Sequence, residues 1–538
     1  MSNSCNTQVP TALLEAPPRR EPPAHERRKS YGQILKSSAL IGGSSVVGIG
    51  IGIVRTKAMA LLLGPAGVGL MGLYSSVADL TQSVVGMGLN SSGVRQIAEA
   101  AGSGEAERIA RTATVLRRVS FLLGAVGAAF LVLFAKPMSV LTFGSARNTA
   151  GVALLSVVVL CRSISAGQAA IIQGLRRISD LAKMGVLGAL FGALVSIPLV
   201  YCFGERGIVP SLIGVAGTSI LTSWWYSRKA KVPAASLPWL QVRQEAAALL
   251  KLGFAFMATG FLMMGAGYAI RIIVLRRAGF EAAGLYQSAW NLAGVYVGFI
   301  LASMGADFYP RLTAVAKDNA ECNRLVNEQA QISLLLAGPG VLATMTFAPL
   351  VIALCYSSKF MAAVGVLRWF CLGLTLQVVA WPMGFVVVAK NKQKIFFWTE
   401  LAAALVQVAL GWICIEYFGL AGAGMSFFGL YGWHSLLIYW IVRRLSGFRW
   451  SAANRKLNLL FLPLIGLVFC GFHLLPFWLA TTAGTVAALS SGIYSMRTLL
   501  KLVSVVRLPL RVRKVLVQIG VVSPCEEDRE NDDKDGLR

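Results

Sequence analysis

Charged residues are scarce in this sequence. They make up 14% of its 538 residues, whereas hydrophobic residues make up 56%. A soluble domain carries about 25% charged residues, so this composition excludes an ordinary soluble protein. Histidine occurs only three times, and the nine cysteines include no Cys-x-x-Cys pair. The usual zinc motifs are therefore missing, and we expect neither a metal site nor a cofactor.

Long apolar runs dominate the chain instead. Each is roughly 20 residues long, which is the length that crosses a bilayer as a helix. They predict an all-α polytopic membrane protein with about 12–14 transmembrane helices. The expected spans are 34–63, 66–90, 119–135, 149–172, 182–203, 207–226, 247–275, 284–306, 331–356, 363–389, 395–418, 420–442, 457–476 and 478–496.

The formal net charge of +26 has a topological explanation. With the N-terminus in the cytosol, most Lys and Arg residues of the loops fall on the cytosolic side, as the positive-inside bias requires. No nucleic-acid-binding motif accompanies the charge, so we expect no nucleic-acid partner. Both termini are predicted to be cytoplasmic, with a polar disordered tail over 1–30 and a basic, then acidic, tail over 501–538.

The sequence also contains an internal repeat. Displacing it against itself by 215 or 216 positions aligns Arg55 with Arg271, Gly64 with Gly279, and Phe203-Gly204 with Phe418-Gly419. This repeat predicts two six-helix bundles around a central cavity, followed by an additional transmembrane pair. The expected units are the bundles 31–230 and 247–445, the cytosolic linker 231–246 and the pair 446–500. An even number of spans makes the repeats parallel, an arrangement suited to alternating access.

Arg55 and Lys57 lie inside the first apolar run. A cation within a membrane helix costs several kcal/mol, so it usually faces water and a partner. Because an arginine recurs at Arg271, we expect Arg55 and Arg271 to line a cationic cavity for an anionic, phosphate-bearing passenger. The alternative is that Arg55 and Lys57 extend to the outer headgroups.

Polar residues with helical spacing follow in the second span of each half. Asp79 is expected to pair with Arg55 or to take up a coupling proton, and Glu400 is a second candidate for ion coupling. His434 is either a satisfied packing residue or a proton relay. The candidate substrate-binding residues are Arg55, Arg271, Asp79, Arg162, Gln287 and Asn291.

Gly64-Pro65-Ala66-Gly67, the following Gly69-Leu70 and the stretch GMGLNSSGVRQIA resemble the Wzx-type polysaccharide flippases. These belong to the multidrug/oligosaccharidyl-lipid/polysaccharide exporter superfamily. The resemblance implies translocation of an undecaprenyl-pyrophosphate-linked oligosaccharide across the bacterial inner membrane, for O-antigen, exopolysaccharide or capsule. It also implies membrane lipids, a polysaccharide polymerase and a chain-length regulator as partners.

Three alternatives remain open at this stage. Cation-coupled multidrug efflux would require a more acidic cavity than these residues offer. A lipid II flippase would differ only in substrate. A membrane enzyme would need catalytic groups in an extramembrane loop, and the short loops contain no Asp-x-Asp motif, so we do not expect an enzyme.

Overall fold

The computed structural model describes residues 24–102, 105–233, 235, 238–303 and 308–502. Within these ranges the regular secondary structure is helical, without strands. The helices are α1 (Ala24–Val85), α2 (Leu89–Gly102), α3 (Ala106–Leu133), α4 (Ala135–Phe143), α5 (Thr149–Gly174), α6 (Ile178–Phe203), α7 (Ile208–Lys229), α8 (Trp239–Ser303), α9 (Tyr309–Ala314), α10 (Asn319–Thr346), α11 (Ala348–Cys355), α12 (Ala363–Ala389), α13 (Gln393–Ser446), α14 (Ala452–Leu474) and α15 (Phe477–Leu502).

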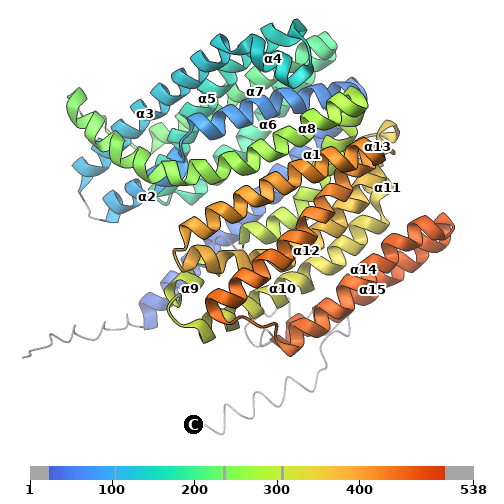
Figure 1. The fold of residues 1–538 in the computed structure, drawn as a ribbon. Helices are drawn as coiled ribbons and strands as arrows, with labels where there is room; N and C mark the ends of the chain where they lie inside the picture. The colour runs from blue at the N-terminus through green and yellow to red at the C-terminus, as the bar shows by residue number, and fades with distance from the viewer. Residues whose placement is uncertain (1–23, 103–104, 234, 236–237, 304–307, 503–538) are drawn as a thin grey trace, which may run out of the picture.

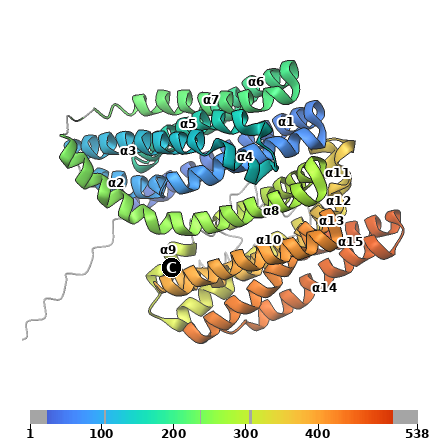
Figure 2. The ribbon, with the colours of Figure 1, turned by 45° about the horizontal axis from the view of Figure 1, so that its top comes forward.

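The long helices run side by side in two groups (Figures 1 and 2). We call α1–α7 the N-terminal half and α8–α13 the C-terminal half. Figure 2 shows α8 between the other helices of the two halves. The pair α14–α15 lies at the outer edge of the second group (Figure 1). The predicted all-α polytopic fold is confirmed.

Glycine breaks divide the longest helices. Gly64 in α1, Gly279 in α8 and Gly419 in α13 have φ values of 64°, 86° and 57°, which L side chains rarely adopt. By length and hydropathy, seven helices of the described chain can cross a membrane, or eight if the bent pair α10–α11 counts as one span. Counted at the breaks, the same residues form fourteen long segments: two each in α1, α8 and α13, and one each in α3, α5, α6, α7, α10, α12, α14 and α15.

The breaks recur at the spacing of the sequence repeat. Gly64 and Gly279 share an extended ψ, and Gly204 (φ 57°, ψ −133°) matches Gly419 (φ 57°, ψ −136°). A short helix follows the third long segment of each half, namely α4 after α3 and α11 after α10. These matches support the proposed duplication of a six-helix unit.

Two predicted spans differ from the observed helices. The span expected at 119–135 belongs to α3, which begins thirteen residues earlier at Ala106, because its Arg-rich first turns continue the helix beyond the apolar run. The span expected at 331–356 is not one helix, since α10 ends at Thr346 and α11 is bent from it by 78°.

The expected segment boundaries also shift. Residues 24–30 of the predicted tail belong to α1, and residues 239–246 of the predicted linker belong to α8. In both places the helix continues past the end of the apolar run. Residues 1–23 and 503–538 of the predicted tails lie outside the described residues.

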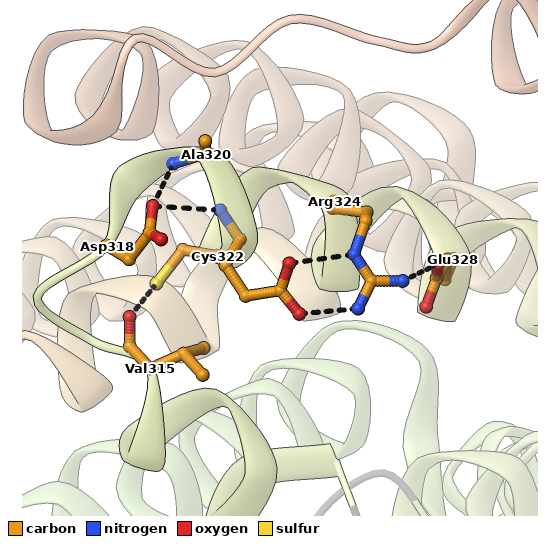
Figure 3. Close-up of polar contacts among 7 residues, drawn as sticks. Val315, Asp318, Ala320, Cys322, Arg324 and Glu328 are labelled. Carbon is orange, nitrogen blue, oxygen red and sulfur yellow. Dashed lines mark hydrogen bonds and ion pairs between the residues drawn. The ribbon is translucent and has the colours of Figure 1, made fainter.

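The start of α10 is fixed by its own polar side chains (Figure 3). Asp318 caps the helix by accepting hydrogen bonds from the backbone N–H of Ala320 at 2.9 Å and of Glu321 at 3.2 Å. Arg324 then bridges Glu321 and Glu328, and its hydrogen bond lowers the pKa of the Glu321 carboxyl. These exposed charges explain why the apolar part of α10 begins well after Asn319.

The additional pair α14–α15 packs on α10. Gly338 of α10 faces the ring of Phe461, and Gly484 of α15 faces Thr346, with no room for a Cβ at either glycine. Oδ1 of Asn327 in α10 accepts two hydrogen bonds, from the backbone N–H of Ser451 at 2.8 Å and from the side-chain amide of Asn454 at 2.9 Å. Both ends of the pair are therefore attached to the C-terminal half.

Candidate functional site

The two halves meet where the second segments of α1 and α8 cross. A Cβ on Gly69 would lie 2.7 Å from the backbone nitrogen of Gly284, which is closer than atoms pack. These glycines are 215 positions apart, so they are equivalent residues of the two repeats. Gln287 lies one turn beyond this crossing, and a Cβ on Gly72 would be 3.0 Å from its Cγ. The polar side chains of α8 therefore begin at the boundary between the halves.

Arg271 starts a chain of hydrogen bonds along this boundary. Its Nε donates to Oε1 of Gln287 at 2.9 Å, and Nε2 of Gln287 donates to Oδ1 of Asn291 at 2.8 Å. Asn291 in turn reaches the hydroxyl of Tyr356 at 3.4 Å. The structure thus brings together three residues that were singled out from the sequence. It adds Tyr356, which gave no signal because a lone aromatic residue in an apolar run is ordinary.

A second cationic group lies in the N-terminal half. Arg162 of α5 forms an ion pair with Asp79 of α1, with Nη1 and Oδ1 2.5 Å apart. The expected pairing of Asp79 with Arg55 is therefore wrong. The reason is packing, because Arg162 extends from α5 to this carboxylate whereas Arg55 is directed toward α6. The Arg162 and Asp79 side chains are 34% and 49% exposed, so the rest of the protein leaves part of each charged group uncovered.

Arg55 is half-buried and is held by α6. Its Nε donates to Oγ of Ser196 at 2.9 Å, and Ser196 is fully buried. Arg162 is near enough for its charge to act on Arg55. Arg55 therefore points into the N-terminal half. Ser196 was missed because single serines are common in membrane helices.

Lys57 is bound by the other half of the protein. Its Nζ donates to the carbonyl oxygen of Ala353 in α11, at 3.3 Å, and so crosses to the C-terminal half. Arg55 and Arg271, in contrast, each donate from Nε to a side chain of their own half. Their convergence on one cavity stays a prediction.

Glu400 lines a different space, a cavity of about 390 Å³ between α8, α12 and α13. Gln407, predicted to share its helix face, lines the same cavity, and so does His434. The Nδ1 atom of His434 is buried without a hydrogen-bond partner among the described residues. Among the described residues, no group of three or more His, Cys, Asp or Glu side chains is placed to hold a metal ion.

Comparison with solved structures identifies the architecture. The lipid II flippase MurJ in an inward closed conformation superposes with a TM-score of 0.62 at 15% identity, over 87% of this chain and all of that one. An inward-facing multidrug-resistance MATE transporter superposes with a TM-score of 0.58 at 16% identity, over 78% of this chain and 95% of that one. The chain therefore has the fold of these multi-pass membrane transporters.

Sequence comparison gives the family. The lipid III flippase of Escherichia coli (strain K12) is 22% identical over 407 residues, which cover 74% of this chain and 95% of that protein. A family model described as polysaccharide biosynthesis protein matches residues 58–365, more than half of the chain. The resemblance seen in the sequence is thereby confirmed, and the chain belongs to the polysaccharide biosynthesis protein family.

Proposed function

We propose that this protein is a flippase that moves an undecaprenyl-pyrophosphate-linked oligosaccharide across the bacterial inner membrane by alternating access. The observation that carries the proposal is the placement of Arg162 and Arg271. Both lie within long helices. Each is hydrogen-bonded to a polar side chain, and an arriving phosphate can replace that side chain as the partner of the guanidinium. Guanidinium binds phosphate through paired hydrogen bonds.

Names of relatives support the substrate class. The E. coli relative is called a lipid III flippase, and the family is described by polysaccharide biosynthesis. A translocated oligosaccharide would then pass to a polysaccharide polymerase and a chain-length regulator. These partners stay part of the proposal.

The Arg162–Asp79 pair provides a route for ion coupling. A phosphate that binds Arg162 competes with Asp79 for the same guanidinium. Once released, the Asp79 carboxylate has lost its cation and gains from taking up a proton or a metal cation. Substrate entry and ion entry are thereby linked at one arginine. Glu400 remains the second candidate for this role.

Deletion of the gene tests the proposed function. The lipid-linked oligosaccharide should accumulate on the cytosolic leaflet, and surface polysaccharide should be lost until the full chain is supplied again. Accumulation is measured by extraction and mass spectrometry of undecaprenyl-linked lipids. A deletion strain that keeps its surface polysaccharide and becomes sensitive to cationic drugs would instead identify an efflux transporter.

A further inference from the structure

The cavity beside Glu400 is lined by two kinds of side chain. Its wall combines flat aromatic rings with hydrogen-bonding side chains. The rings belong to Trp290, Trp381, Phe385, Phe396, Phe427 and Tyr431, and the polar groups belong to Gln377, Glu400, Gln407 and His434. At about 390 Å³, the cavity falls within the size range of small-ligand pockets.

Its histidine and its carboxylate make few polar contacts with the described part of the protein. Nδ1 of His434 is buried without a hydrogen bond. The Glu400 carboxylate is half-buried, and no hydrogen bond or ion pair joins it to another described residue. Buried polar groups normally have partners, because each one left unpaired costs about 1–3 kcal/mol. The cavity is therefore arranged for an occupant that supplies hydrogen bonds.

The aromatic wall is held in a fixed orientation. Trp381 meets Phe385 edge to face, with ring centroids 6.2 Å apart and planes at 88°. Trp290 meets Phe427 edge to face, with ring centroids 5.5 Å apart and planes at 90°. Such contacts hold a ring face at a defined angle, as a stacking partner requires.

The cavity lies directly beside the Arg271 chain. Gly267 lines it, and a Cβ on Gly267 would be 3.4 Å from Nη1 of Arg271. Trp290 lines it as well and precedes Asn291, the last α8 member of that hydrogen-bond chain. A group covalently joined to a phosphate on Arg271 would consequently enter this cavity first.

We propose that this cavity is the saccharide subsite of the transporter and holds the sugar nearest the pyrophosphate. The apolar faces of a sugar ring stack on the indoles, while its hydroxyl groups bond to Glu400, His434 and the two glutamine amides. The volume accommodates about one or two sugar rings. The inference rests on the proposed function and identifies the part of the substrate site that binds the sugar.

Two other occupants fit the wall less well. A bare metal cation needs several converging oxygen ligands, and Glu400 is the cavity's single carboxylate. An organic cation would use the aromatic faces and Glu400, but it would leave the N–H groups of Gln377 and Gln407 without acceptors. A sugar uses both kinds of group.

The experiment compares two ligands on the full-length protein in lipid nanodiscs. One is undecaprenyl pyrophosphate, and the other is the undecaprenyl-pyrophosphate-linked oligosaccharide extracted from deletion cells. We expect Trp381→Ala and Glu400→Gln to weaken binding of the sugar-bearing lipid about tenfold or more, which corresponds to about 1.4 kcal/mol. Binding of undecaprenyl pyrophosphate should not change. Trp398→Ala is the matched control, because Trp398 lies two residues before Glu400 but is 65% exposed and outside the cavity.

Trp381→Phe, which keeps a ring, should retain most of the affinity and shows that the site still folds. Equal affinity of wild type and Trp381→Ala for the sugar-bearing lipid would overturn the saccharide subsite. Loss of binding to both lipids in the cavity variants would overturn it too. If sodium or tetraphenylphosphonium binds wild type and is lost in Trp381→Ala, the cavity is a cation site and the proposal is wrong. Failure of the proposed function differs from these results, because wild type would then bind neither lipid.

Discussion

Nζ of Lys57 lies 3.3 Å from the carbonyl oxygen of Ala353, so the N-terminal half holds the short helix α11 of the C-terminal half. The opposite contact runs from Arg276 of α8, which donates to the carbonyls of Val140 and Leu141 at 2.9 and 2.6 Å. Those carbonyls belong to the last turn of α4, the equivalent short helix of the N-terminal half. A cation at a helix C-terminus stabilises the free carbonyls there. The halves are thus joined by two reciprocal caps on the side predicted to be outer.

Removal of both caps should favour opening of that side. We expect the double variant Lys57→Met, Arg276→Met to shift the equilibrium between the closed and the open outer side about tenfold toward the open form. The reason is that each cap contributes about 0.3–1 kcal/mol, and more when it is partly buried. A cysteine substituted at Leu285, beside the crossing of the halves, reports the shift by its labelling rate with an impermeant maleimide in a background without native cysteines. Lys359→Met is the control, since Lys359 is an exposed cation of the same predicted side. Unchanged labelling in the double variant would show that the caps do not hold this side closed.

The crossing of Gly69 and Gly284 should tolerate no side chain. In Gly284→Ala the new Cβ would overlap backbone atoms of the other half, near Pro65 and Gly69. Relief requires the helices to separate, at a cost of about 1–3 kcal/mol, so closure of the outer side should fail and surface polysaccharide should fall severalfold. Gly294→Ala on the same helix has open space at its Cβ and should transport normally. Export at the wild-type rate by Gly284→Ala would mean that this close approach is not needed for the transport cycle.

The sequence predicts the helix breaks well, because they depend on local chemistry. Apolar length defines each span, and Gly64, Gly279 and Gly419 stand where only glycine turns the chain easily. The bend between α10 and α11 could not be predicted, since the residues around Phe347 form one continuous apolar run. Hydropathy shows that the run is apolar, but it does not show where the helix axis bends within it.

Pairing of side chains was predicted less well than their location. Spacing correctly put Gln287 and Asn291 on one face, where they form one hydrogen-bond chain. The partner of Asp79 depends on which helix packs beside it, and periodicity within one helix carries no information about its neighbours. Ser196 could not be predicted as the partner of Arg55 for the same reason, since it lies on a neighbouring helix.

Disruption of the Arg162–Asp79 pair should impair transport far more than folding. Both side chains are at least one-third exposed, so the pair contributes at most about 1 kcal/mol to stability. We therefore expect Asp79→Asn to change the melting temperature little, while the rate of flipping in proteoliposomes falls about tenfold or more because the coupling carboxylate is lost. Reversal of the pair, Asp79→Arg with Arg162→Asp, restores the attraction and should restore stability but not transport. Full transport by Asp79→Asn would remove Asp79 from the coupling mechanism.

Substitution by lysine should have different effects on transport at Arg271 and at Arg55. Arg271 reaches Gln287 through Nε and keeps its terminal nitrogens for a phosphate, so both Arg271→Ala and Arg271→Lys should reduce surface polysaccharide strongly, lysine being unable to form the paired contact. Arg55 is held by one bond to Ser196, and its charge acts beside Arg162. Arg55→Lys should accordingly retain partial export, whereas Arg55→Ala should abolish it. Quantification of surface polysaccharide at equal membrane levels of each variant checks the order. If Arg271→Lys exports as well as wild type, the site uses Arg271 as a simple positive charge, and paired recognition of phosphate has to be assigned to another residue.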